Sequence, residues 1–177
     1  MTDIFSKIDK IYNEAGHNHY GEGVSQIEHA VQCARLAVEE GERSDMVVAA
    51  LLHDIGHLIG EVNSDHGNFS HDHAGAEFLS RYFPPGVTEP VRLHVSAKRY
   101  LCTTEAGYID SLSEASRYSL EHQGGLMTED EVTAFRAEPF YEQAIRLRRW
   151  DDEGKDETLA STPFNSFSRY VEDVCNV

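Results

Sequence analysis

A helix of small apolar residues that ends in adjacent histidine and aspartate side chains is the feature that most constrains this chain. The run Ala49–Leu52 contains no polar position, so the helix that carries it is expected to be buried. His53 and Asp54 follow directly, and Gly56 is expected to break the helical pattern there. Neighbouring side chains on a regular helix point about 100° apart, but at a helix end both can reach one cavity. The run therefore predicts a helical protein with a metal site in its core.

Apolar residues recur at helical spacing along almost the whole chain. Ile4, Ile8 and Ile11 share one face of the first segment, and the clearest breaks are Pro84-Pro85-Gly86 and Gly124-Gly125. We therefore expect an all-α bundle that forms one domain over residues 1–177, with a polar loop over residues 59–72. The predicted helices cover residues 3–14, 25–40, 44–53, 73–82, 87–99, 111–121, 129–135, 138–151 and 165–175.

Composition excludes several classes of function. The chain has 177 residues, of which 15 are basic and 31 are acidic, so its formal charge is −16. Because such a charge repels phosphate backbones, we expect no nucleic-acid partner. No run of 18 apolar residues exists, so we expect no membrane span, and the N-terminus lacks the apolar region of a signal peptide. Cys33, Cys102 and Cys175 are few and widely spaced, which favours reduced thiols and a cytoplasmic protein.

Two further residues complete a set that could bind one metal ion together with His53 and Asp54. His29 lies 24 positions before His53, enough chain for one helix and a turn to bring the two imidazoles together. Asp151 follows Trp150 at the end of a basic helix. Taken alone, His29 reads as a surface histidine and Asp151 as a solvated helix end, so it is the combination that predicts a metal site.

His73 and His94 raise the predicted number of metal ions from one to two. His73 is chosen because it opens a helical run, and His17, His19, His66, His71 and His122 compete for this role. With Asp54 as a bridge, the six ligands would hold two ions about 3.5–4 Å apart. A set of nitrogen and oxygen donors suits iron, manganese or zinc and does not choose among them.

Several other polar residues are candidates for binding a substrate. Lys98 lies one helical turn after His94 and His57 just after the His-Asp pair, so both could act on a substrate oxygen. A basic cluster of Arg146, Arg148 and Arg149 precedes Asp151 and could supply one guanidinium for a phosphate-like group. The remaining candidates are Ser113, Ser116 and Gln123 near the Gly-Gly turn, and the loop residues His19, Tyr20 and Glu22.

The motifs together resemble the HD-domain superfamily, whose members are normally metal-dependent phosphohydrolases. They resemble more closely its mixed-valent di-iron oxygenase branch, which includes myo-inositol oxygenase and 2-amino-1-hydroxyethylphosphonate dioxygenases. The resemblance covers residues 20–152, and the block around His94 is its most specific part. The shared sequences are Gln26-Ile27-Glu28-His29, Ala49–His57, Asp72-His73 with Gly75-Ala76, His94–Leu101, Leu112–Ser116, Gln123-Gly124-Gly125 with Met127, and Arg148 with Trp150-Asp151.

This resemblance implies two iron ions, Fe(II)/Fe(III), in an HD-type helical bundle. It implies O2-dependent cleavage of the carbon–phosphorus bond of a 1-hydroxy-2-aminoethylphosphonate or its N-trimethyl analogue, made by a separate hydroxylase. The ligands would be His29, His53, Asp54, His73, His94 and Asp151, and the phosphonate would contact His57, Lys98, Ser116, Gln123 and Arg148.

The resemblance matches Glu22 to an acidic residue that meets the substrate's cationic nitrogen. In the related enzymes, a tyrosine three residues before this acidic residue can occupy the open position on the iron. This chain has His19 there, with Tyr20 next to it, so either residue could gate the site. For the trimethyl form, Tyr20, Tyr100, Tyr108 and Glu22 could supply a cation–π cradle. The alternatives are a two-metal phosphohydrolase and a non-catalytic sensor.

Overall fold

The regular structure of the described residues is helical, which confirms the all-α prediction. The computed structural model describes residues 3–60, 65 and 67–176. In chain order the elements are α1 (Asp3–Ala15), α2 (Gln26–Glu39), α3 (Ser44–Leu52), α4 (Ile55–Ile59), α5 (His71–Leu79), α6 (Pro85–Thr104), α7 (Tyr108–Ser111), α8 (Glu114–His122), α9 (Glu129–Ala137), α10 (Tyr141–Glu153), the 3-10 helix η1 (Phe164–Phe167) and α11 (Ser168–Val174).

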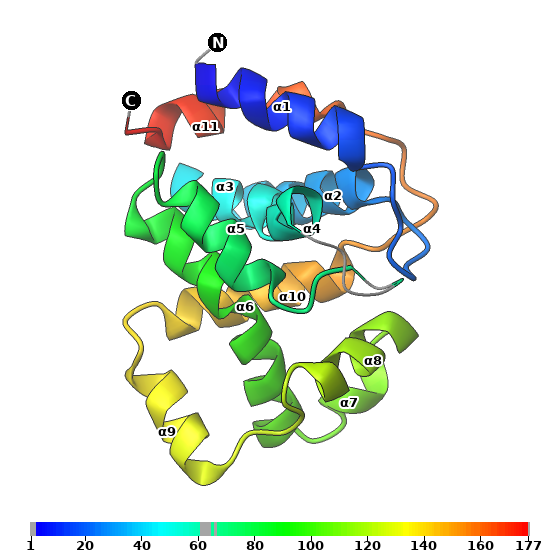
Figure 1. The fold of residues 1–177 in the computed structure, drawn as a ribbon, viewed down its shortest axis with the longest axis vertical. Coiled ribbons are helices and arrows are strands. Elements are labelled where there is room, and N and C mark those ends of the chain that lie inside the picture. Colours follow the sequence, from blue (N-terminus) through cyan, green and yellow to red (C-terminus); the bar gives the residue numbers. More distant parts are fainter. Residues whose placement is uncertain (1–2, 61–64, 66, 177) are drawn as a thin grey trace.

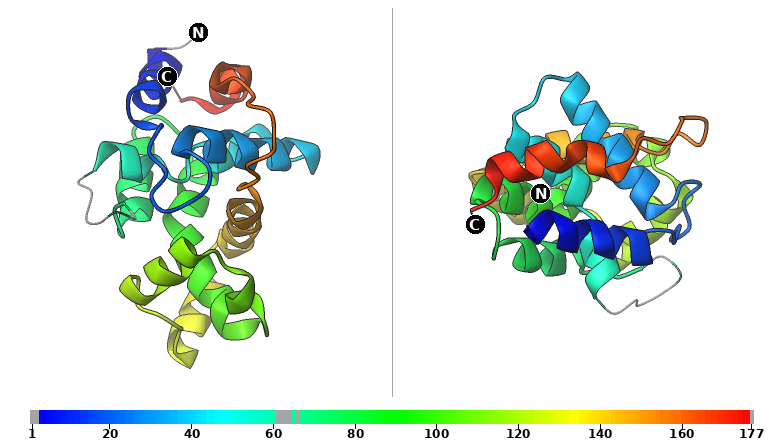
Figure 2. Two further views of the ribbon diagram at one scale, coloured as in Figure 1. Left: turned by 90° about the vertical axis from the view of Figure 1, so that its right-hand side faces the viewer. Right: turned by 90° about the horizontal axis from the view of Figure 1, so that it is seen from above.

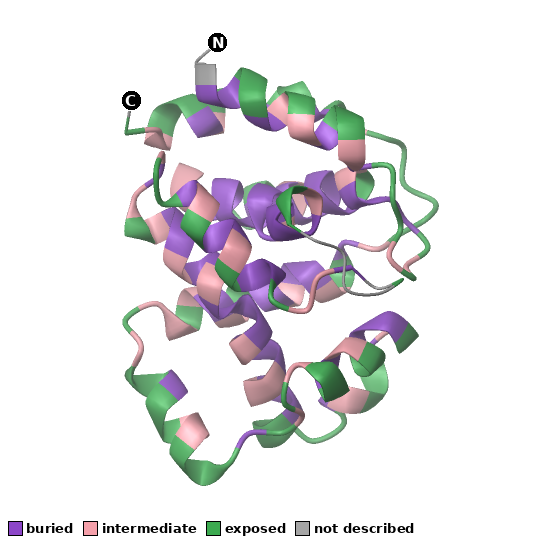
Figure 3. Cartoon of the chain, viewed as in Figure 1, coloured by how far each residue is buried: buried purple, intermediate pink, exposed green. Residues whose placement is uncertain are grey.

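Helix α3 is the centre of the larger part of the molecule. All its residues from Met46 to Leu52 are buried, and α2, α6, α10 and α11 pack around it (Figures 1 and 3). Helices α1 and α11 cover one end of this core, and both described chain ends lie there (Figure 2). An uninterrupted apolar helix can be buried on all sides in this way because none of its side chains needs water.

The long helix α6 connects this core to a smaller lower part formed with α7, α8 and α9 (Figure 1). Two satellite apolar clusters hold the lower part together, one around Leu93 and Phe135 and the other around Leu101 and Leu120. The middle of α6 carries His94, and Lys98 follows one turn later, so this helix places a predicted metal ligand and a predicted substrate contact between the two parts.

The helices near the His-Asp pair differ from the predicted ones. Helix α3 ends at Leu52, and Gly56 does not stop the helical pattern but lies inside the short helix α4. A Cβ on Gly56 would stand 1.9 Å from the carbonyl oxygen of His71, so the glycine is needed for the close approach of α4 and α5. Helix α5 begins at His71, two residues before the predicted start at His73. His53 and Asp54 therefore lie at a junction of two helices.

Within the described residues, no helix is both long and apolar enough to cross a membrane.

Candidate metal centre and substrate pocket

Helices α2 and α10 and the junction between α3 and α4 bring a first group of ligand atoms together. His29 comes from α2, His53 and Asp54 from the junction after α3, and Asp151 from α10. The Nε2 atom of His29 lies 3.2 Å from Nε2 of His53, 3.3 Å from Oδ1 of Asp151 and 3.7 Å from Oδ2 of Asp54. Ligand atoms bonded at about 2.1 Å to one ion stand about 3.0 Å apart at right angles and up to about 4.2 Å apart on opposite sides of the ion. The spacing of these atoms fits a single metal ion.

A second group of ligand atoms lies on the other side of the same aspartate. Nε2 of His71 is 2.9 Å from Nε2 of His94 and 3.2 Å from Oδ1 of Asp54. Nε2 of His94 is 3.7 Å from the same oxygen. Because Oδ2 of Asp54 faces the first group, its two carboxylate oxygens face two separate sets of imidazoles. This arrangement fits two ions bridged by Asp54.

The four histidines of the two groups share one hydrogen-bond pattern. Nδ1 of His29, His53, His71 and His94 donates to the carbonyl oxygen of Gly154, Ala50, Asn68 and Val91 respectively, at 2.7–2.9 Å. A carbonyl can only accept, so Nδ1 carries the hydrogen and the lone pair of the neutral ring lies on Nε2. All four lone pairs then face the carboxylates of Asp54 and Asp151. A bound cation would stabilise this arrangement. Backbone carbonyls that fix the ligand tautomer in this way are typical of metal-binding histidines.

His57 is oriented in the opposite sense. Its Nδ1 accepts from the backbone N–H of Asn68 at 2.9 Å, so in the neutral ring Nε2 carries the hydrogen. That nitrogen lies 4.0 Å from Oδ1 of Asp54, and the ring stacks on His71 with centroids 3.8 Å apart. Burial and the neighbouring His71 hold the pKa of His57 well below its usual value. His57 is therefore placed as a neutral hydrogen-bond donor at the edge of the centre and not as a ligand.

The choice of His73 as a metal ligand is wrong in this structure. The side chain of His73 is 68% exposed and its Nδ1 contacts Asp72. His71 instead occupies the position beside His94 that was predicted for His73. Residues two apart on a helix point about 200° apart, so only one of the two histidines can face the centre. Among the other competitors, His17, His19 and His122 are exposed. His66 lies outside the described residues.

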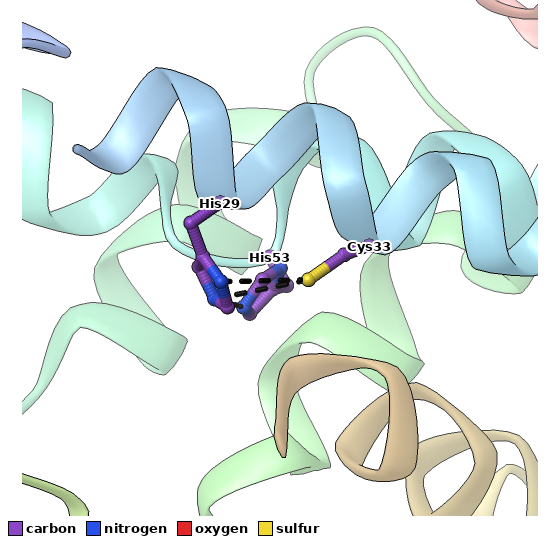
Figure 4. A group of neighbouring side chains, drawn as sticks. All are labelled: His29, Cys33 and His53. Atoms are coloured by element: carbon purple, nitrogen blue, oxygen red, sulfur yellow. Dashed lines mark hydrogen bonds between the residues drawn. The ribbon is translucent and has the colours of Figure 1, made fainter. Parts of the chain in front are cut away.

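Cys33 lies beside His29 and His53, close enough to be considered as a third ligand (Figure 4). Its sulfur is almost equally far from both ring nitrogens of His29, at 3.7 and 3.8 Å, so it lies along the ring and not in front of the Nε2 lone pair. The thiol donates to the carbonyl oxygen of Trp150 at 3.3 Å. Burial raises the pKa of this thiol, which keeps it protonated, and a thiol binds metal only as the thiolate.

Arg148 is the member of the basic cluster that reaches the centre. Its Nη1 donates to Oδ2 of Asp151 at 2.6 Å, and it also pairs with Asp152. Burial raises the pKa of Asp151, but Arg148 and His29 outweigh burial and hold this pKa well below the usual range. The guanidinium thus orients an ionised ligand. Arg146 pairs with Glu40 and Arg149 with Glu105, both on the surface.

A pocket opens directly onto the two groups of ligands. Among the residues that line it are the predicted substrate contacts Tyr20, Glu22, His57, Lys98, Ser116, Gln123 and Arg148. His19 is exposed and does not line the pocket. The hydroxyl of Tyr20 donates to the carbonyl oxygen of His57 at 3.3 Å. Of the two residues predicted to gate the site, the structure therefore places Tyr20 at the pocket.

Lys98 brings a buried ammonium group to this pocket. Within the part of the chain that the structure describes, it donates to Oγ of Ser119 at 2.7 Å and to the carbonyl oxygen of Ser116 at 3.4 Å, and it contacts no carboxylate. Burial, followed by the nearby guanidinium of Arg148, lowers the pKa of Lys98 to about 7. An entering anion would supply the opposite charge that this ammonium lacks.

Lys155 and Gln26 are among the pocket residues that sequence reasoning missed. Lys155, just after α10, donates to Oε1 of Glu22 at 2.9 Å and to Oγ of Ser116 at 3.3 Å. Gln26 lines the pocket with a buried Oε1 that has no hydrogen-bond partner among the described residues, as does Gln123. Lys155 lies outside every recognised motif, so only its spacing of one helical turn after Asp151 could have drawn attention to it.

Comparison with known proteins shows the family of the chain. Residues 27–152 match the model of the HD domain family. The chain is 41% identical over 177 residues to a hydroxymethylphosphonate dioxygenase of Gimesia maris, covering 97% of this chain and 86% of the relative. It is 39% identical over 175 residues to a [1-hydroxy-2-(trimethylamino)ethyl]phosphonate dioxygenase (glycine-betaine-forming) of Leisingera caerulea, covering 96% and 89%. The chain therefore belongs to the HD-domain family and, within it, to the group of phosphonate dioxygenases.

Proposed function

We propose that this protein is a di-iron oxygenase that uses O2 to cleave the carbon–phosphorus bond of a 1-hydroxyphosphonate and releases phosphate. The proposed ligands are His29, His53 and Asp151 with one oxygen of Asp54 for one ion, and His71 and His94 with the other oxygen for the second ion. Bound iron would supply the activation of O2, which no side chain of the pocket can perform.

The observation that carries this proposal is the convergence of three cations on Ser116, beside the ligand cluster. Lys98 contacts its carbonyl oxygen, and Arg148 and Lys155 contact its hydroxyl, at 3.3–3.4 Å. In a chain with a net charge of −16, such a concentration of positive charge indicates a site for a small, highly charged anion. A phosphonate group fits this chemistry, and the two dioxygenases named above carry phosphonate in their names.

The pocket residues would divide the work of binding and orientation. Lys98 and Arg148 would hold the phosphonate oxygens, so that the carbon bearing the hydroxyl group faces the ligand cluster. The Nε2 hydrogen of His57 would donate to a substrate oxygen at the edge of the centre. Tyr20, packed over His57 with ring centroids 5.1 Å apart, would limit the access of water.

Release of phosphate measured with and without O2 tests this function. Protein loaded with iron under anaerobic conditions should release phosphate from 1-hydroxyphosphonates only after O2 is added, and ¹⁸O from labelled O2 should appear in the phosphate. Electron paramagnetic resonance of partly oxidised protein should show a coupled Fe(II)/Fe(III) signal that changes when substrate is added. Equal release in the absence of O2, or turnover of a phosphate ester with manganese alone, would contradict the proposal and favour the two-metal phosphohydrolase.

The setting of the reaction follows from its substrate. A 1-hydroxyphosphonate must itself be made, so we propose that a separate hydroxylase acts first on the parent phosphonate. Cys33 and Cys102 are free thiols, which supports a reducing, cytoplasmic location.

A further inference from the structure

Lys155 is held in a defined position between the pocket and the end of α10. The backbone of the next residue, Asp156, makes two hydrogen bonds with the side chain of Gln32, each 2.9 Å long. This double contact attaches the segment after α10 to α2. The side chain of Lys155 is only 16% exposed and lines the pocket. Its ammonium group is therefore a fixed part of the pocket wall and not a surface charge.

This ammonium group is paired with the acidic side chain of Glu22. Oε1 of Glu22 accepts from Lys155 at 2.9 Å and from the hydroxyl of Ser113 at 2.7 Å. The other carboxylates that line the pocket are Asp54 and Asp151, and both face the predicted metal ions. Among the described pocket residues, Glu22 is thus the one carboxylate outside the ligand cluster, and the chain's own lysine already neutralises it.

A substrate with a cationic nitrogen would find the one pocket carboxylate outside the ligand cluster already paired with Lys155. Near Glu22 its nitrogen would stand beside the ammonium of Lys155, a like charge in a partly buried site. Beside the ligand cluster it would meet the cationic side chains of Lys98 and Arg148. Two of the tyrosines expected to form an aromatic cradle are also absent from the pocket lining, since Tyr108 bonds to Arg148 and Tyr100 packs on Phe135.

We propose that Lys155 determines substrate specificity: by occupying Glu22 it selects a 1-hydroxyphosphonate that carries no positively charged nitrogen, of the hydroxymethylphosphonate class. This inference rests on the proposed function and replaces the aminated substrates expected from the sequence. The reaction would be HOCH2PO3²⁻ + O2 → HCOO⁻ + HPO4²⁻ + H⁺. Here the C–P bond breaks, one oxygen atom of O2 is retained on carbon and the other on phosphorus, and no external reductant is needed.

Anaerobic binding separates this specificity from turnover. Isothermal titration calorimetry of iron-loaded protein should show that hydroxymethylphosphonate binds at least tenfold more tightly than 2-amino-1-hydroxyethylphosphonate or its N-trimethyl analogue. In Lys155→Met the carboxylate of Glu22 is released, so hydroxymethylphosphonate should bind at least tenfold more weakly and the aminated compounds more tightly. In Glu22→Gln, hydroxymethylphosphonate should bind more tightly and the aminated compounds more weakly, because Lys155 is then free to contact the phosphonate. The exposed Lys10→Met serves as the matched control and should leave every affinity unchanged.

The outcomes distinguish the two proposals. Equal or tighter binding of an aminated compound by the wild type, or unchanged preference in Lys155→Met with full iron content and native circular dichroism, would overturn the role of Lys155. Selective binding of hydroxymethylphosphonate without phosphate release in O2 would support the specificity and contradict the oxygenase. Absence of binding by all three compounds would contradict both.

Discussion

Nε2 of His71 lies 2.9 Å from Nε2 of His94, and both nitrogens face the same carboxylate oxygen of Asp54. The two histidines come from the start of α5 and the middle of α6, which pack against each other. Because each Nδ1 is bound to a backbone carbonyl, the orientation of His71 is set by the loop before α5 and that of His94 by α6 itself. This pair forms the half of the proposed centre that a one-metal site would lack.

Replacing His71 by alanine should therefore remove one of the two metal ions. We expect the bound metal to fall from about two ions to about one per chain, and phosphate release to fall at least about 100-fold. His73→Ala, two residues further along the same helix, is the matched control and should retain both ions because its side chain is exposed. Metal analysis of the two purified variants measures the number of bound ions. Loss of metal in His73→Ala with retention in His71→Ala would show that the assignment is reversed.

A methyl group at Gly56 should disturb the same half of the centre through the backbone. The added Cβ would stand 1.9 Å from the carbonyl oxygen of His71, so α4 and α5 must separate. We expect the free energy of unfolding to fall by about 1–3 kcal/mol and the metal content to decrease. Gly86→Ala is a suitable control because its Cβ would approach only the side-chain end of Asp45, and its effect should stay within about 0.5 kcal/mol. Chemical denaturation of the two variants makes the comparison.

The ionisation of Lys98 should appear in the pH dependence of substrate binding. Burial, with Arg148 adding to it, lowers the pKa of this ammonium to about 7, so it is charged below that pH and neutral above it. In the free enzyme, kcat/KM for a phosphonate should therefore decrease above about pH 7, by up to about tenfold per pH unit.

The variant Lys98→Met separates this effect from ionisation of the substrate. It should have a low kcat/KM without the alkaline decrease, because the titrating group has been removed. If the same decrease persists in the variant, the titration belongs to another group. The dependence of kcat/KM on pH, measured for the wild type and for Lys98→Met at equal metal content, decides whether Lys98 is the titrating group.

Cys33 should be dispensable for metal binding although it lies close to two proposed ligands. Its thiol is protonated and donates to Trp150, so Cys33→Ala should keep both metal ions and lose only about 1 kcal/mol of stability. The cobalt-substituted wild-type protein should also show no thiolate-to-metal charge-transfer band. Either a strong band of that kind or loss of an ion in Cys33→Ala would place the sulfur among the ligands.

The sequence by itself determined the helical class and most of the residues that meet at the centre. Amphipathic spacing predicts helices because it reports which face is buried, and His29, His53, Asp54, His94 and Asp151 stand in motifs with recognisable surroundings. The structure brings these five residues together. Their binding of iron stays a prediction, as do the substrate contacts of His57, Ser116 and Gln123.

Only the tertiary structure decided which residues complete the site. An error of two residues at the start of α5 exchanges His71 for His73, because each residue turns the helix by about 100° and the buried and exposed faces are then reversed. The pairing of Lys155 with Glu22 joins residues 133 positions apart and follows no local periodicity. Such contacts depend on how α2 and the end of α10 pack, and packing is set by the whole core and not by any one segment.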